Sequence, residues 1–435
     1  MRRPWWIPFF LGAVPDVDAR TLTLLGTVGL AVFFEAYDLS LLTSALSFIA
    51  ADLDISEQNL GFWTGLIRLG GLPAFALLPF ADRFGRRAVF LASLLGLSLA
   101  TIASAFSPTI AVFAGLQMVA RVSYITFSAT AIVIISEEFP AKHRGWGMGI
   151  FGALGALGYG LSAILFSFIE MLPGGWRALY LVGAAPLLFL PVFLRNVPET
   201  KRFAEVREQR IDAGDNTSGL TGWAQPIRDL FSTYPRRMLG VTLACFIYTA
   251  AELGVMQFVG YFILEEHGWE PWHYSTLILV GGLIPLWANV AAGRMGDRFG
   301  RRPVGMIVMC LLPVGAIGFF HVPSQQLPIF WIILSFGGVA ANVMLRAIVT
   351  ESFPTSQRST AAGWMTLTST VGAALGLWTI SWGQSQGLSL ATVASLVSCF
   401  AVFAGFALFL LPETRGLELE EISRDPHAKE QPDPG

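Results

Sequence analysis

Long apolar runs alternate with short polar segments along the whole chain. A helix that crosses the hydrocarbon core of a bilayer needs about 20 apolar residues. Twelve stretches fit this requirement, six on each side of the polar segment 198–237. They are residues 22–50, 60–80, 88–106, 109–135, 146–170, 177–196, 238–264, 274–293, 303–321, 327–350, 360–384 and 389–411. Because the runs are continuous and do not alternate, they predict spanning helices and not the strands of a barrel.

The composition supports a membrane protein. Mean hydropathy is +0.60, and charged residues make up 13% of the 435 positions, about half the share found in soluble domains. Too few polar residues are present to cover a water-exposed surface of this size, so lipid is expected around most of the exterior. No nucleic-acid partner is expected. Cys245, Cys310 and Cys399 lie scattered in apolar runs, which predicts neither a disulfide framework nor a metal site.

An internal repeat divides the chain in two. The hexapeptide Asp-Arg-Phe-Gly-Arg-Arg occurs at Asp82–Arg87 and again at Asp297–Arg302. Two further motifs recur 214 residues later, Glu137–Arg144 as Glu351–Arg358 and Pro198–Thr200 as Pro412–Thr414. Three motifs in the same order at nearly the same spacing predict two parallel six-helix halves, related by an axis along the membrane normal.

The repeat and the spans together define the expected domains. They are an N-terminal segment 1–21, a first bundle 22–196, a linker 197–237, a second bundle 238–411 and a tail 412–435. The N-terminal segment resembles a short signal peptide, but its prolines favour a segment at the membrane surface.

The distribution of Lys and Arg predicts the orientation. With twelve spans, 24 of the 28 Lys and Arg residues fall in the termini and loops of one side, and only Arg177 falls in a loop of the other. Positive residues stay on the cytoplasmic side. We therefore expect both termini and the linker in the cytoplasm, with the chain in the plasma membrane, which in a bacterium is the inner membrane.

These motifs resemble those of the major facilitator superfamily. The Asp-Arg-x-Gly-Arg-Arg loop after helices 2 and 8 is similar to the signature of that family. The motifs after helices 4, 6, 10 and 12 are similar to the sugar-porter and metabolite:proton symporter branches, and Phe34–Asp38 is close to a motif of aromatic-acid symporters. The resemblance covers residues 20–416. It implies an all-α major facilitator fold of two pseudo-symmetric six-helix bundles that work by alternating access, without a cofactor or catalytic residues.

The repeated loop motifs carry a candidate gate. The resemblance implies that their charges form a cytoplasmic latch, closed when the central cavity opens outward and broken when it opens inward. The alternative is that they only anchor the topology. The candidate gate residues are Asp82, Arg86, Glu137, Arg144, Asp297, Arg301, Glu351 and Arg358.

Charged residues inside the spans are the candidates for coupling, because a charge at the bilayer centre costs roughly 2.5–3.5 kcal/mol on insertion scales. Glu35 and Asp38 lie on one face of helix 1, and Glu252 on helix 7 is the repeat equivalent of Asp38. In the family that the chain resembles, a helix-1 acid with a helix-4 base often carries the proton, which suggests Asp38 with Arg121. A static ion pair of Asp38 with Arg68 or Arg121 is the alternative.

The arginines also suggest the cargo, because the guanidinium fork binds carboxylates through two hydrogen bonds. An organic anion is therefore favoured, although the arginines can also simply neutralise Glu35 and Asp38. Among the candidate substrate contacts given next, the tryptophans can instead anchor or pack helices, and the asparagines can form hydrogen bonds between helices. The candidate substrate contacts are Arg68, Arg121, Tyr124, Gln257, Tyr261, Trp287, Asn289, Asn342 and Trp364.

The sequence thus predicts a proton-coupled symporter for a small metabolite, with an organic acid as the favoured cargo, functional as a monomer. A proton-driven drug or metabolite exporter and a sugar transporter remain as alternatives. Helices 7 and 10 lack the motifs of sugar porters, and helix 5 lacks the Gly-Pro pair of drug antiporters. A membrane enzyme is disfavoured because no nucleophile–base pair or phosphate loop is found. A non-transporting sensor is disfavoured because the linker and tail are short.

Overall fold

The computed structural model describes residues 4, 6–7, 14–140, 142–200, 224–282, 284–354 and 357–415, without the side chains of 78–79, 82, 224, 284–286 and 290. These parts contain helices and no strand. The first half has α1 (Ala19–Ser44), α2 (Leu46–Asp52), α3 (Glu57–Leu69), α4 (Ala74–Phe84), α5 (Arg86–Ala105), α6 (Ile110–Glu138), α7 (Arg144–Phe166), α8 (Trp176–Gly183) and α9 (Leu190–Asn196).

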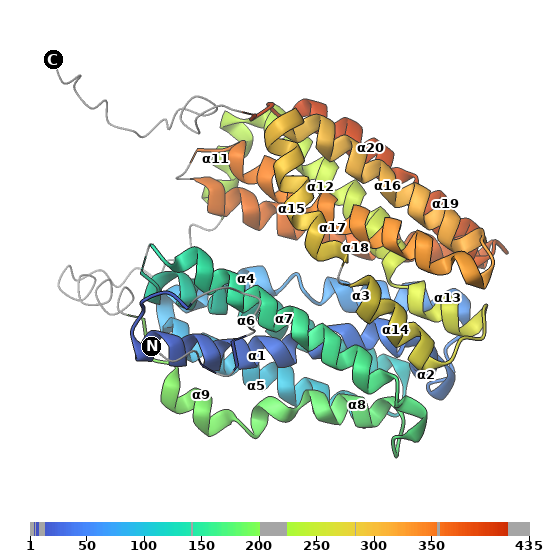
Figure 1. The fold of residues 1–435 in the computed structure, drawn as a ribbon, viewed down its shortest axis with the longest axis horizontal. Helices are drawn as coiled ribbons and strands as arrows, with labels where there is room; N and C mark the ends of the chain where they lie inside the picture. The colour runs from blue at the N-terminus through green and yellow to red at the C-terminus, as the bar shows by residue number, and fades with distance from the viewer. Residues whose placement is uncertain are drawn as a thin grey trace. The chain divides into compact units, whose positions relative to one another are not determined.

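In the second half, α11 comes first, and α12 to α20 then follow in the order of α1 to α9 (Figure 1). This half has α11 (Ala224–Thr233), α12 (Pro235–Met256), α13 (Val259–Glu265), α14 (Pro271–Gly281), α15 (Ile284–Phe299), α16 (Arg301–His321), α17 (Leu327–Glu351), α18 (Arg358–Ser385), α19 (Leu390–Ser398) and α20 (Phe400–Ala407). Among the described residues, ten helical segments are long and apolar enough to cross a membrane. The other two expected spans, 274–293 and 360–384, fall on α14 with α15 and on α18. The predicted all-helical architecture is therefore confirmed.

The chain divides into two compact units. Unit 1 comprises Met1–Ser56, Leu66–Thr221 and Ile263–Thr276, and unit 2 comprises Glu57–Gly65, Gly222–Phe262 and Leu277–Gly435. In unit 1, α1 packs along α7, and α5 packs along α6 and α8. In unit 2, the repeat equivalents pack in the same way, α12 along α18 and α16 along α17 and α19. The same pairs of neighbours in both units show that the sequence repeat is also a repeat of structure.

Glycines bring the paired helices together. A Cβ atom on Gly158 of α7 would lie 2.0 Å from the carbonyl oxygen of Phe33 on α1, and one on Gly372 of α18 would lie 2.3 Å from that of Phe246 on α12. The two glycines are 214 residues apart. Only a residue without a side chain lets two membrane helices approach this closely, backbone to backbone.

Two short segments belong to the unit opposite to their half of the sequence. Residues 57–65 join unit 2, where Trp378 Nε1 donates to the carbonyl oxygen of Phe62 at 3.1 Å. Residues 263–276 join unit 1, where the Tyr274 ring meets the Phe166 ring edge to face at 5.5 Å between centroids. Glu57 and Pro271 begin equivalent helices of the repeat. The exchange is therefore itself symmetric.

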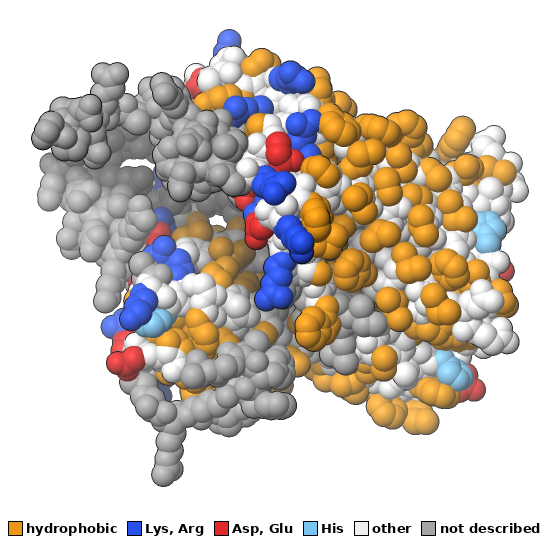
Figure 2. Space-filling view, turned by 45° about the horizontal axis from the view of Figure 1, so that its top comes forward, with side chains coloured by type: hydrophobic (Ala, Val, Ile, Leu, Met, Phe, Trp, Pro, Cys, Tyr) orange, Lys and Arg blue, Asp and Glu red, His pale blue; other side chains and the backbone are white. Residues whose placement is uncertain are grey.

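The exterior fits a lipid environment. Large apolar side chains such as Leu99, Ile307 and Phe403 are exposed on the helices. Figure 2 shows orange hydrophobic side chains across a broad part of the visible face, with most Lys and Arg in a band from the top to the centre of the view and at its lower left. The described part of the N-terminal segment packs on the protein, because Ile7 is buried in a core cluster with Leu25 and Phe151. The linker charges at 201–218 lie outside the described residues.

Candidate transport site

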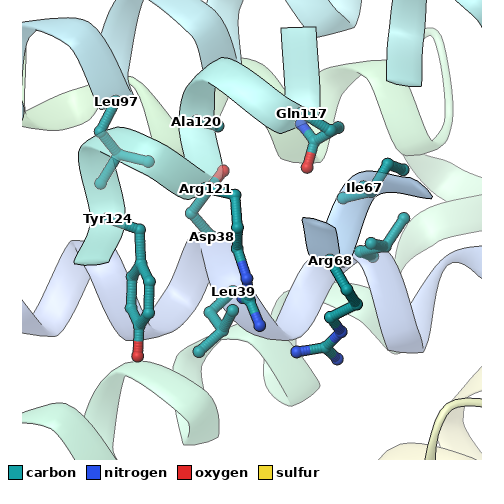
Figure 3. A pocket seen from close by; sticks show the side chains of 10 residues that line it. Asp38, Leu39, Ile67, Arg68, Leu97, Gln117, Ala120, Arg121 and Tyr124 are labelled. Atoms are coloured by element: carbon teal, nitrogen blue, oxygen red, sulfur yellow. The ribbon is translucent and has the colours of Figure 1, made fainter. Parts of the chain in front are cut away.

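A cavity in unit 1 collects several of the predicted site residues (Figure 3). It encloses about 410 Å³ of space between atoms, a figure that includes the open solvent at its mouth. Four helices line it, α1, α3, α5 and α6. The lining residues are Asp38, Leu39, Leu42, Ile67, Arg68, Leu97, Gln117, Ala120, Arg121 and Tyr124.

Three polar residues of α6, Gln117, Arg121 and Tyr124, line this cavity. The guanidinium carbon of Arg121 lies over the Tyr124 ring, 5.2 Å from its centroid, so the aromatic face helps to hold the cation. In Figure 3 the Arg121 and Arg68 side chains extend towards the same side of the pocket. Gln117 is different, because its Nε2 donates to Ser104 Oγ on α5 at 3.0 Å, which makes it part of the wall. The cavity therefore presents two guanidinium groups from two helices.

Asp38 has a partner that the sequence did not suggest. Its side chain is buried, at 8% exposure, and its Oδ1 accepts a hydrogen bond from Thr101 Oγ1 of α5 at 2.9 Å. Within the described part of the chain, Asp38 forms no ion pair with Arg121, and the choice between a coupling role and a static pair stays a prediction. The Asp38 carboxylate points away from the arginine ends in the view of Figure 3.

Glu35 lies one helical turn before Asp38 and is 4% exposed. Ser128, Asp38 and Arg121 are its polar and charged neighbours. Two carboxylates thus lie on one buried face of α1, beside a cavity that holds two arginines. Burial removes the water that stabilises a carboxylate, so an opposite charge, a hydrogen-bond donor or a proton must replace it.

Two site residues were missed by the sequence reasoning. Tyr159 on α7 has Arg121, Glu35 and Arg68 as charged neighbours, and 44% of its surface is exposed. Its only signal in the sequence is a tyrosine between Gly158 and Gly160 in an apolar helix. Thr101 gave no signal, because threonines in spanning helices commonly bond to their own backbone.

The predicted residues of unit 2 form separate contacts. Asn342 Nδ2 on α17 donates to Glu252 Oε1 on α12 at 2.7 Å and to the carbonyl oxygen of Gly338 at 3.0 Å. Trp364 Nε1 donates to Thr242 Oγ1 at 2.8 Å. Asn342 and Trp364 therefore each join two helices, one of the roles left open by the sequence.

The remaining candidates of unit 2 differ in exposure. Gln257 is buried and Tyr261 is half-buried, both near the junction of α12 and α13. Trp287 is 75% exposed, and Asn289 is exposed as well. A role of these four residues in binding stays a prediction.

The candidate gate of the first half is a local network. Arg86 Nη2 lies 3.5 Å from Glu137 Oε1, and the backbone N–H of Arg86 donates to Glu199 Oε1 at 2.8 Å. The Glu199 carboxylate thus caps α5, which begins directly after Gly85 with its φ of 101°. Arg144 is exposed, and the side chain of Asp82 lies outside the described part.

The second half repeats this network. Arg301 Nη2 lies 3.1 Å from Glu351 Oε1 and 2.8 Å from Asp297 Oδ1, and its backbone N–H donates to Glu413 Oε1 at 2.7 Å. Arg358 Nε donates to the carbonyl oxygen of Phe353 at 3.2 Å. In both halves the first arginine after the loop glycine, Arg86 or Arg301, pairs with the glutamate at the end of the following long helix, Glu137 or Glu351. The glutamate of Pro-Glu-Thr, to which no role had been assigned, caps the helix.

A sequence model described as Major Facilitator Superfamily matches residues 28–377 and 241–431. The chain belongs to the major facilitator superfamily. It is a membrane transporter that works by alternating access, and not an enzyme. The resemblance seen in the sequence motifs is thereby confirmed.

Its relatives include transporters of named small molecules. The niacin transporter NiaP of Acinetobacter baylyi is 26% identical over 367 residues, which cover 79% of this chain and 82% of the relative. The gentisate transporter of Corynebacterium glutamicum is 24% identical over 411 residues, covering 90% and 88% of the two chains. Among solved structures, the inward-open xylose transporter XylE from E. coli has a TM-score of 0.71 at 19% identity, covering 92% of this chain and 98% of that one. The last match shows the fold alone.

Proposed function

We propose that this transporter is a proton-coupled symporter for small organic acids, with aromatic carboxylates as the first candidates. One observation carries the proposal: Arg68 and Arg121 line one cavity of unit 1, and the buried carboxylates Glu35 and Asp38 lie on α1 beside it. Each charge is expensive inside a membrane protein, so four of them around one cavity indicate a pathway for charge.

The arginines suit a carboxylate cargo. A guanidinium binds a carboxylate through two parallel hydrogen bonds, and two guanidiniums can share its oxygens. Tyr124 and Tyr159 add phenol rings next to Arg121, and such rings can pack against an aromatic cargo. The names of the relatives, transporters of niacin and gentisate, support an organic acid.

Charge balance supplies the coupling. In the empty cavity the positive charges of Arg68 and Arg121 are balanced by Glu35 and Asp38. A bound substrate carboxylate takes over part of this balance, which leaves one buried carboxylate in excess. A proton on Asp38, the prime candidate, or on Glu35 restores neutrality. Anion and proton binding therefore favour each other, and this linkage is reciprocal.

Alternating access places this site in a moving framework. The bundles 22–196 and 238–411 move relative to each other, with Glu252 as a second coupling acid in the second bundle. The arginine–glutamate networks lie at the cytoplasmic ends, where each braces its own side of the gate. The bias of Lys and Arg supports cytoplasmic termini in a bacterial inner membrane. We propose that the transporter acts as a monomer.

Reconstituted protein tests the proposal. Uptake of labelled benzoate, nicotinate and gentisate is measured in proteoliposomes with and without an inward proton gradient, with xylose as the control substrate. We expect the gradient to drive accumulation of at least one carboxylate and not of xylose. Asp38→Asn should abolish accumulation and leave exchange of labelled for unlabelled substrate measurable. Normal gradient-driven accumulation by this variant would refute Asp38 as the coupling residue.

A further inference from the structure

Three elements converge behind Asp38, on its side away from the cavity arginines. Thr101 of α5 is fully buried and donates its hydroxyl to Asp38 Oδ1 at 2.9 Å. Gly183 of α8 leaves the space for this contact, because a Cβ atom there would lie 3.3 Å from Asp38 Oδ1 and 3.0 Å from Thr101 Cγ2. The Tyr37 hydroxyl donates to the carbonyl oxygen of Leu179 at 2.9 Å, which ties α1 to α8 beside the same site.

The Thr101 hydrogen bond differs from those of other threonines in the spans. Thr126 and Thr130 of α6 donate to carbonyl oxygens one turn back in their own helix, as is usual for such residues. Thr101 instead donates its hydroxyl across helices to an acidic side chain. A hydrogen bond to a charged group is stronger than one between neutral groups. The contact therefore determines where the Asp38 carboxylate lies.

The position of Asp38 matters for the cavity because Arg121 is close enough to interact with it electrostatically, without an ion pair between them. A carboxylate that turned from Thr101 to Arg121 would occupy the guanidinium that a substrate anion needs. It would then act as a competing internal anion.

We propose that Thr101 is a positioning residue, whose hydroxyl holds the ionised Asp38 carboxylate against α5 so that Arg121 stays available to an anionic substrate. This inference rests on the proposed function, since it requires an anion as cargo. It gives Thr101 of α5 a role in substrate affinity, although Thr101 is not among the residues that line the cavity.

The test measures the KM of benzoate exchange in proteoliposomes for Thr101→Val and Thr101→Ser. Valine has the shape of threonine without the hydroxyl, and serine keeps the hydroxyl. We expect Thr101→Val to raise the KM on the order of tenfold, the strength of a hydrogen bond to a charged group, and Thr101→Ser to stay near wild type. Thr101→Ala serves as a second variant should valine impair folding. Thr130→Val, which removes a buried hydroxyl bonded within its own helix, should leave the KM unchanged.

The same substitutions in an Asp38→Asn background separate positioning from packing. A neutral asparagine does not compete for Arg121, so Thr101→Val should cause no further rise in KM there. An equal rise in both backgrounds, or an unchanged KM in the Asp38 background, would overturn the role of Thr101 alone. Absence of carboxylate exchange by the wild type would overturn the proposed function, and this inference with it.

Discussion

Asn342 and Glu252 join α17 to α12 through one hydrogen bond of 2.7 Å, from Nδ2 to Oε1. Glu252 is the repeat equivalent of Asp38, and Asn342 is the equivalent of Ser128, the polar neighbour of Glu35. Both units thus place a polar residue of the fourth helix next to an acid of the first helix. Only unit 1 adds arginines at this level, because the positions equivalent to Arg68 and Arg121 are Gly282 and Ser335.

The Asn342–Glu252 contact predicts unequal effects of substituting its two members. Glu252→Gln retains an oxygen that accepts the hydrogen bond, whereas Asn342→Leu takes a donor away from a carboxylate. We expect Asn342→Leu to lower the free energy of unfolding by about 1–3 kcal/mol and Glu252→Gln to change it less. Thermal unfolding in detergent, followed by fluorescence, measures both. A larger loss for Glu252→Gln would contradict the arrangement.

Arg121 is expected to contribute to substrate binding through the paired N–H donors of its guanidinium as well as through its charge. Arg121→Gln should raise the KM for benzoate about 10- to 100-fold, since one or two hydrogen bonds to a charged group are lost. Arg121→Lys should recover only part of this, because an ammonium group cannot make the paired contact. Arg346→Gln is the matched control, since Arg346 is exposed on α17. A lysine variant with wild-type KM would show that charge alone is required.

The close approach of α7 to α1 predicts a position-specific cost of adding one methyl group. Gly158→Ala places a Cβ atom 2.0 Å from the carbonyl oxygen of Phe33, so the helices must shift, at a cost of about 1–3 kcal/mol. Gly152→Ala in the same helix has no atom within 4 Å of the new Cβ and should be neutral or slightly stabilising. Unfolding in detergent measures the stability of both variants, and equal stabilities would refute the close contact.

The expected orientation can be checked by labelling single cysteines. After the three native cysteines are replaced by serine, Met171→Cys and Lys142→Cys are introduced one at a time. Met171 is 82% exposed between α7 and α8, and Lys142 is exposed just before α7. We expect a membrane-impermeant maleimide to label Met171→Cys in intact cells and Lys142→Cys only after permeabilisation. The reverse pattern would invert the topology.

Much of the fold was predictable because its signals are local. Continuous apolar runs identify spans, and repeated motifs identify the two halves. The symmetric exchange of residues 57–65 and 263–276 between the units was not predictable, since it depends on packing between helices far apart in the sequence, such as the bond from Trp378 to Phe62. Apolarity along one helix carries no information about its neighbour.

The candidate site was predictable in its charges and not in its contacts. Asp38, Glu35, Arg68 and Arg121 were found because charge in an apolar run is conspicuous. Their partners were not, because Thr101 and Tyr159 are ordinary residues of spanning helices whose roles follow from their positions in space. The gate shows the same limit, since in the described part of the chain Glu137 and Glu351 pair with Arg86 and Arg301 and not with the arginine of their own motif.

The glutamate caps on α5 and α16 have a mechanical consequence. Glu199, Arg86 and Glu137 all belong to unit 1, and Glu413, Arg301 and Glu351 all belong to unit 2. Each bracing is closed within its own unit, so relative displacement of the units does not have to rupture it. Each network ties the first residue of one helix, in α5 or α16, to the last turn of its neighbour, α6 or α17, and to the segment that follows the last helix of the unit. These three parts of each unit are therefore expected to move together as one rigid end.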